Sequence, residues 1–312
     1  SSEGTRLCQS YLNCCVLPHV DYPVRPWRTG GRVMFEGVAE PAHWINVAST
    51  TSVPRLTRFM DHYWKMPKPE VIITVTGGAQ DFQLSRQQQV AFDRGLVSAA
   101  QSAKAWIFTA GSDTGVMRLV GNAMAKYAVD LPVVGVFPWG VVNEREQLTN
   151  TSGAGSLRPG SASYTPSPPS IDGAPLNPNH THFIFVDDGK EGRDAWGSEI
   201  RLRSALESAI AKAKNIPIVQ LVVQGGPGTL ATVESTALSG KPIIVLFDTG
   251  GAAAALHAYC TVGLDAVEAR FQKMEARLLP PCSLRHCPAH ACIGSNWHAC
   301  PANRKSSMQS NS

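Results

Sequence analysis

Residues 216–230 restrict the possible folds more than any other part of this sequence. They begin with an almost continuous apolar run at 218–223, rich in β-branched residues, which is typical of a strand buried on both faces of a parallel sheet. A Gly-Gly-Pro-Gly-Thr turn at 225–229 follows, and then a helical pattern. Strand, glycine turn and helix together direct bare backbone N–H groups at an anion, because glycine lets a phosphate approach the main chain. A tight turn that binds nothing gives the same pattern, so this stretch alone leaves both interpretations open.

The arrangement repeats along the chain, and the repetition predicts the fold. Five further apolar runs bounded by turn residues lie at 71–75, 105–109, 132–137, 182–186 and 242–247, with helical patterns at 85–102, 116–128 and 199–214. Alternation of buried strands and helices predicts an α/β fold, a Rossmann-like, doubly wound, mostly parallel sheet. Two short strands at 32–35 and 43–47 and an amphipathic helix at 52–64 are expected before it. Ligands of such sheets bind beyond the carboxyl ends of the strands, where the strand order reverses.

Four of the predicted strand ends carry glycine together with threonine or serine. They lie at 76–78, 109–115, 225–229 and 248–251, and we expect them to share one edge of the sheet. The sequence therefore predicts a site there for a nucleotide or another phosphorylated ligand. The candidate ligand-binding residues in these loops are Thr76, Gly77, Gly78, Gly111, Thr114, Gly225, Gly226, Gly228, Thr229 and Gly250.

Composition divides the chain into three parts. Residues 1–31 lack periodicity and are expected to be an irregular lead-in, followed by the nucleotide-binding domain at 32–260. A Ser/Gly/Pro-rich stretch at 150–178 is expected to be a mobile loop within that domain. Residues 261–312 are expected to form a helix and then a Cys/His/Pro-rich, disordered tail. Because the sequence has no initiator Met and no signal-peptide pattern, we expect a fragment or a processed chain.

Charge and hydropathy exclude two classes of partner. The chain has 28 basic and 24 acidic residues, a net charge of +4, which is too small to indicate nucleic-acid binding. No apolar run approaches the roughly 20 residues needed to cross a bilayer, so this chain itself is expected to contain no transmembrane segment.

The eight cysteines lie near the two ends of the chain, with none between Cys15 and Cys260. The central domain therefore gives no sign of a disulfide framework, which favours a reduced, cytosolic setting. The last four cysteines, at 282, 287, 292 and 300, lack the close pair that structural zinc sites use. No metal site is predicted, and zinc binding in the tail is the alternative.

Several motifs, in a fixed order, carry a resemblance to a known family. They are the Thr-Gly-Gly of 76–78, the Thr-Ala-Gly-Ser-Asp-Thr-Gly of 109–115, the Val-Asp-Asp-Gly of 186–189, the Glu-Ile-Arg-Leu-Arg of 199–203 and the glycine turn of 225–229. With these motifs, about residues 32–256 resemble the cytosolic N-terminal homology region of melastatin-type transient receptor potential (TRPM) cation channels.

This resemblance implies a Rossmann-like domain related to the SLOG and LOG nucleotide-processing proteins. In ADP-ribose-responsive channels the region can hold that nucleotide, so ADP-ribose or a related adenine nucleotide is the expected ligand, with no cofactor required. The resemblance assigns Arg203 to a phosphate and Trp196 to stacking on the base. It also implies a cytosolic domain of a membrane protein whose partners are other channel subunits, in a homotetramer.

The sequence departs from the family at two positions and from the LOG-type enzymes at a third, and the departures leave three functions open. Gly251 stands where ADP-ribose-binding members have an arginine, and Ala110 replaces a loop glycine. LOG-type enzymes carry a catalytic Glu at the position of Thr232, and Glu234, two residues further along the helix, points away by about 200°. We therefore predict a ligand sensor that is not an enzyme. The alternatives are a stand-alone LOG-like nucleotide-binding or nucleotide-hydrolysing protein and a scaffold with a decayed site.

Overall fold

A computed structural model describes residues 30–149 and 161–263. The predictions of an irregular lead-in before residue 30, a mobile segment at 150–160 and a disordered tail after 263 lie outside these residues. Within them, nine strands form one sheet in the order β6-β1-β2-β7-β5-β4-β3-β8-β9. The strands are β1 (Gly30–Phe35), β2 (Ala42–Ala48), β3 (Ile72–Gly77), β4 (Trp106–Thr109), β5 (Val133–Pro138), β6 (Ser161–Tyr164), β7 (His182–Asp187), β8 (Ile218–Val223) and β9 (Ile243–Leu246).

Every neighbouring pair of strands is parallel except β1 and β2. The six apolar runs predicted to share one parallel sheet are β3, β4, β5, β7, β8 and β9. Side chains of β5 and β7 are buried along their whole length, as expected for strands covered on both faces. The predicted fold class is confirmed.

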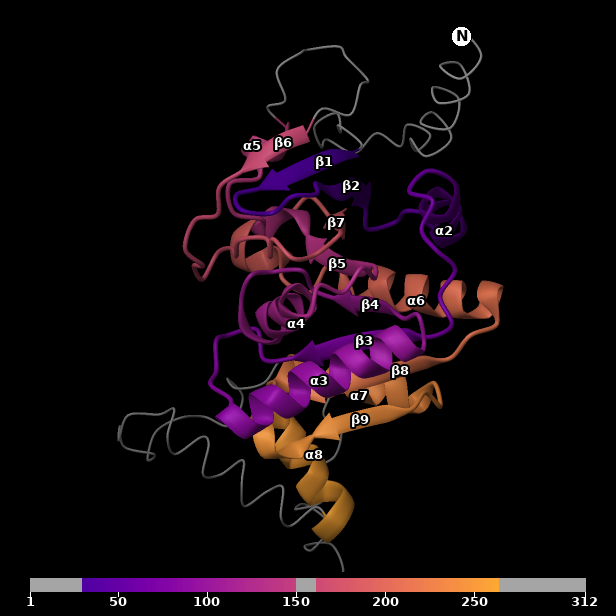
Figure 1. The fold of residues 1–312 in the computed structure, drawn as a ribbon, viewed down its shortest axis with the longest axis vertical. Coiled ribbons are helices and arrows are strands. Elements are labelled where there is room, and N and C mark those ends of the chain that lie inside the picture. The colour runs from indigo at the N-terminus through magenta and orange to yellow at the C-terminus, as the bar shows by residue number, and fades with distance from the viewer. Residues whose placement is uncertain (1–29, 150–160, 264–312) are drawn as a thin grey trace, which may run out of the picture. The chain divides into compact units, whose positions relative to one another are not determined.

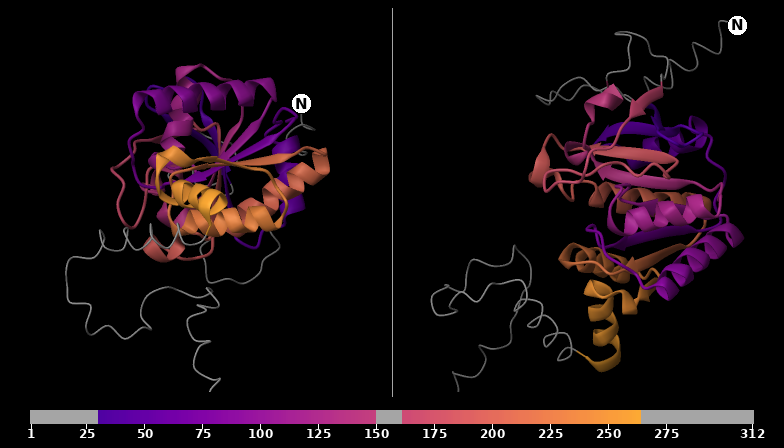
Figure 2. Two further views of the ribbon diagram at one scale, coloured as in Figure 1. Left: turned by 90° about the horizontal axis from the view of Figure 1, so that it is seen from below. Right: turned by 60° about the vertical axis from the view of Figure 1, so that its left-hand side comes forward.

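Helices cover both faces of the sheet (Figures 1 and 2). The α-helices are α2 (Val53–His62), α3 (Arg86–Ser102), α4 (Gly115–Lys126), α5 (Glu146–Thr149), α6 (Ile200–Lys214), α7 (Pro227–Leu238) and α8 (Gly251–Val262). Three short 3-10 helices are η1 (Trp139–Val141), η2 (Gly192–Ala195) and η3 (Phe247–Thr249). Local sequence signals set some of these boundaries: Ser85 and Gln88 form a capping box at the start of α3, and Asn215 ends α6 in the left-handed conformation.

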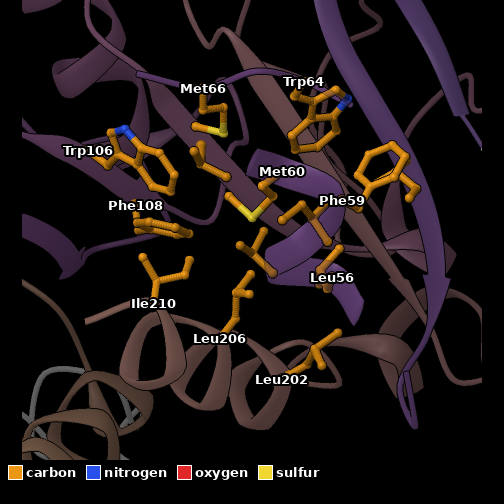
Figure 3. Packing of buried hydrophobic residues seen from close by; sticks show 14 of the residues in the cluster. Leu56, Phe59, Met60, Trp64, Met66, Trp106, Phe108, Leu202, Leu206 and Ile210 are labelled. Carbon is orange, nitrogen blue, oxygen red and sulfur yellow. The ribbon is translucent and has the colours of Figure 1, made fainter. Parts of the chain in front are cut away.

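Two apolar cores lie on opposite faces of the central strands. On one face, α2 and α6 pack against β4 and β5, and Figure 3 shows Leu56 and Met60 of α2 pointing towards Leu206 and Ile210 of α6. On the other face, α3 and α4 pack against β3 and β4. These cores fix the positions of the strand ends from which the candidate loops extend.

The expectation of a mobile loop is wrong for residues 161–178. Residues 161–164 are strand β6, which pairs with β1, and the Tyr164 side chain is buried. The Tyr164 hydroxyl donates to the Asn143 carbonyl at 2.8 Å and accepts from the Leu176 N–H at 3.3 Å. The Ser-Ala-Ser-Tyr alternation that forms this strand is too short to stand out in a segment rich in serine and proline. Composition alone does not reveal that two of its side chains point inward.

Candidate functional site

The strand order reverses between β3 and β8. From β3 the chain passes through α3, on one face, to β4; from β8 it passes through α7, on the opposite face, to β9. The two strands are paired in register, with Gly77 opposite Val223. Ligands of doubly wound sheets bind at such a point, and the loops that follow β3 and β8 meet here.

Hydrogen bonds join the loop after β3 to strand β8 and to helix α4. The Gly78 N–H donates to the Val223 carbonyl at 3.1 Å, and the Gly78 carbonyl accepts from the Val116 N–H at 2.9 Å. A Cβ atom at Gly77 would collide with the Val223 carbonyl oxygen, so β8 and this loop approach closely only because the residue is glycine. Thr76, which precedes the glycines, is partly buried.

The loop after β8 leads directly into α7. Gly225 has φ +92°, and Gly226 is the residue that caps α7, with φ −129°. Thr229 holds the loop to β3, because its hydroxyl accepts from the Gly226 N–H at 3.3 Å and donates to the Gly77 carbonyl at 3.4 Å. Among the described residues, no acceptor meets the Gly228 N–H at the first turn of α7. A helix N-terminus with such a donor attracts anions.

The three glycines of this loop differ in what a Cβ atom would meet if it were added to each of them. A Cβ atom at Gly226 or at Gly228 would have no neighbour within 4 Å, whereas one at Gly225 would collide with Thr229. Gly225 is therefore required by packing, and Gly226 and Gly228 border open space.

The loop after β4 lies at the same edge, but its polar groups are used within the protein. Gly111 is buried with φ +89°, and its N–H donates to the Thr109 hydroxyl at 2.8 Å. The hydroxyls of Thr114 and Ser112 lie 2.9 Å apart in a hydrogen bond. The N–H of Gly115, at the start of α4, donates to the Asp81 carboxylate at 2.8 Å. Gly111 and Thr114 are thus placed at the predicted edge, with partners already supplied by the chain.

The loop after β9 packs against the loop after β8. The N–H groups of Ala252 and Ala253, at the start of α8, donate to the carbonyls of Gly225 and Gln224, both at 2.9 Å. Gly251 has φ +54°, and a Cβ atom there would collide with the Gly225 carbonyl oxygen. An arginine at this position is therefore incompatible with the observed packing. Gly250, the residue before it, has φ +87° and an open Cβ direction.

Arg203 extends from α6 into the protein interior. Its Nε donates to Glu207 at 2.9 Å, and its Nη2 donates to the Thr74 hydroxyl at 2.6 Å. The same Nη2 also donates to the carbonyls of Val75 at 3.1 Å and Phe108 at 3.0 Å, at the ends of β3 and β4. Arg203 joins α6 to two strands of the sheet, so its contact with a phosphate stays a prediction.

Trp196 lies in the turn between η2 and α6, nearer to β5 than to the glycine loops. Its ring packs edge-on against Phe137 of β5, with ring centres 5.8 Å apart, and its Nε1 donates to the Ile171 carbonyl at 3.4 Å. The side chain is partly exposed, as a base-stacking residue requires. Stacking on a base stays a prediction.

Six side chains that the sequence did not single out have buried polar atoms without partners among the described residues. Three lie in or just after β2, Trp44, Asn46 and Thr51, and the others are Ser198, at Oγ, Glu199, at Oε2, and Gln220, at both amide atoms. Burial raises the pKa of the Glu199 carboxyl. Hydrogen bonds from the N–H groups of Glu199 and Gly197 and the positive charge of Arg203 lower this pKa, but the effect of burial is larger. Buried polar atoms normally have partners, and no periodicity or motif marks these exceptions in a single sequence.

Thr232 of α7 donates to the Gly228 carbonyl at 3.0 Å, while Glu234 is exposed on the same helix. That a catalytic Glu of LOG-type enzymes is replaced by Thr232 stays a prediction from the resemblance. Among the described residues no group of three or more His, Cys, Asp or Glu side chains could hold a metal ion. No helix in the described ranges is both long and apolar enough to span a bilayer.

The sheet order and the reversal between β3 and β8 define a Rossmann-like α/β domain. Residues 42–279 match the family described as SLOG in TRPM, so the chain belongs to this family and the resemblance is confirmed. The chain is 35% identical over 246 residues to transient receptor potential cation channel subfamily M member-like 2 of Nematostella vectensis, and 34% identical over 241 residues to subfamily M member 2 of Rattus norvegicus. Subfamily M member 6 of Homo sapiens is 32% identical over 241 residues.

These matches cover most of this chain and a small part of each relative. They span 73%, 70% and 73% of the chain, but 16%, 15% and 12% of the three relatives. The similarity therefore establishes the domain's family, and the activity of the complete relatives is a separate question.

Proposed function

We propose that this domain is the cytosolic ligand-sensing region of a TRPM-type cation-channel subunit, and that it binds an adenine nucleotide of the ADP-ribose kind without turning it over. The observation that carries this proposal is the pair of glycine loops at the β3–β8 reversal, joined by Thr229, with a Gly228 N–H at the start of α7 that has no acceptor in the described part of the chain. Those groups suit a diphosphate, because a helix N-terminus and bare main-chain N–H groups attract phosphate oxygens.

Binding at this point would act on the rest of the domain through the strand ends. Thr229 contacts the β3 loop, and Arg203 joins the ends of β3 and β4 to α6. A nucleotide that shifts either glycine loop would therefore also shift α6 through these contacts. In the complete channel we expect further copies of the subunit as partners, in a homotetramer, and gating as the regulated property. No metal or second cofactor is required by this proposal.

Two measurements on the 312-residue chain test the proposal. Titration calorimetry with ADP-ribose should give saturable binding, and chromatography of the mixture should recover the nucleotide unchanged. Absence of heat at millimolar ADP-ribose would instead support a scaffold whose site has decayed. Release of ribose 5-phosphate by wild-type protein, abolished in Glu234→Gln, would support a hydrolase.

A further inference from the structure

The turn that begins α6 contains polar atoms that the protein itself leaves unsatisfied. Glu199 caps this 15-residue helix, and its Oε2 atom is buried without a partner among the described residues. The adjacent Ser198 Oγ is buried and unpartnered in the same way. A buried carboxylate oxygen without a hydrogen-bond donor is costly, which points to a ligand that supplies one.

The path of α6 places Glu199 at the edge of the sheet that carries the glycine loops. Glu199, Arg203 and Glu207 are spaced four residues apart, so they follow one line along the helix. Arg203 reaches the carbonyls of Val75 in β3 and Phe108 in β4 and forms its ion pair with Glu207, so Glu199, one turn nearer the helix start, has no ion-pair partner among the described residues. Because α6 connects β7 to the parallel strand β8, its start lies at the carboxyl edge, close to the ends of β3 and β4.

The strand order arranges the candidate binding groups along this edge. Trp196 packs against Phe137 of β5, Arg203, one turn after Glu199, reaches carbonyls of β4 and β3, and the open glycine loop follows β8. Neighbouring strands lie about 4.8 Å apart, so β5 and β8 are separated by roughly 14 Å. The parts of a nucleotide follow the same sequence, with the base first, the ribose next and the diphosphate last.

We propose that the Glu199 carboxylate accepts a hydrogen bond from a hydroxyl group of the adenosine ribose, and so selects a ligand with an intact ribose beside its base. This inference rests on the proposed nucleotide site. A carboxylate repels a phosphate, whereas a sugar hydroxyl donates the hydrogen bond that Oε2 lacks. The neighbouring Ser198 hydroxyl can donate to or accept from the second hydroxyl of the same sugar.

The test compares two variants and four ligands by calorimetry on the full chain. The variants are Glu199→Gln, which removes the charge and keeps the shape, and Glu234→Gln, which removes an exposed charge from α7. The ligands are ADP-ribose, its 2′-deoxy and 3′-deoxy analogues on the adenosine ribose, and the analogue with hypoxanthine in place of adenine. We expect Glu199→Gln to bind ADP-ribose about tenfold more weakly than wild type, since a hydrogen bond to a charged group is the stronger kind.

The ribose assignment makes a second, specific prediction. Wild-type protein should bind at least one deoxy analogue about tenfold more weakly than ADP-ribose. The Glu199→Gln variant should bind that analogue and ADP-ribose with almost equal affinity. Glu234→Gln should behave as wild type with every ligand. Equal affinity of wild type and Glu199→Gln for ADP-ribose would overturn the inference while the proposed function stands.

The remaining outcomes distinguish a failure of the ribose assignment from a failure of the proposed nucleotide binding. Glu199-dependent discrimination of the hypoxanthine analogue, without discrimination of the deoxy analogues, would place the carboxylate at the base and overturn the ribose assignment. Failure of wild-type protein to bind any of the four ligands would overturn the proposed function and this inference together.

Discussion

The loop after β8 and the loop after β9 lie side by side and look alike in sequence, yet they differ in how closely the glycines that begin their helices are packed. Cβ atoms at Gly226 and Gly228 would meet nothing, and the Gly228 N–H has no acceptor among the described residues. In the second loop the N–H groups of Ala252 and Ala253 already donate to the main chain of the first, and Gly251 is in close contact with Gly225, although Gly250 borders open space as Gly226 does. A glycine therefore indicates a ligand only when its missing side chain faces outward and nearby donors are free.

Among groups whose hydrogen-bond partners come from the protein itself, as in the loop after β9, Arg203 should have the largest effect on stability. Arg203→Ala should lower the free energy of unfolding by about 3 kcal/mol, because it leaves the buried Glu207 without its positively charged partner and removes hydrogen bonds to two strands. Urea unfolding measures the loss. Arg201→Ala, which changes an exposed arginine on the same helix, should be nearly neutral. Equal stability of the two variants would mean that Arg203 is free to serve a ligand.

Placing at position 251 the arginine that the resemblance predicts for ADP-ribose-binding members tests the packed loop after β9. Gly251→Arg should destabilise the domain by about 1–3 kcal/mol, since the residue has φ +54° and its Cβ would collide with the Gly225 carbonyl. Thermal unfolding and ADP-ribose titration should be measured together, and we expect lower stability without tighter binding. An unchanged melting temperature with increased affinity would show that this loop is as available to a ligand as the loop after β8.

Gln220 should give a smaller effect on stability than Arg203 or Gly251, with the opposite sign. Its side chain is fully buried in β8 and both amide atoms lack partners among the described residues, so Gln220→Leu should stabilise the domain by about 1 kcal/mol. Differential scanning calorimetry measures the gain, and Gln101→Leu, at an exposed position of α3, serves as the control. A loss of stability specific to Gln220→Leu would show that the amide is satisfied in solution.

The sequence was sufficient to predict the parallel strands and the edge that their loops share, because long apolar runs report burial on both faces. It did not reveal β6, where only Ala162 and Tyr164 point inward between serines. It also did not separate a glycine required by packing from one that borders open space, since that depends on φ and on neighbours from other strands. The inward course of Arg203 and the unpaired Glu199 follow from how α6 crosses the sheet, which no local pattern encodes.

The central claim is that the open loop at β8 is a binding surface, and Gly226→Val tests it most directly. Gly226 has φ −129° and its Cβ would meet nothing within 4 Å, so a protein with valine there should fold, with a loss of stability limited to the poorer cap of α7. Its side chain would occupy the space in front of the loop, and calorimetry with ADP-ribose should therefore detect no binding. Gly95→Val, at an open exposed position of α3, should bind as wild type. Full ADP-ribose affinity in a folded Gly226→Val protein would contradict the account.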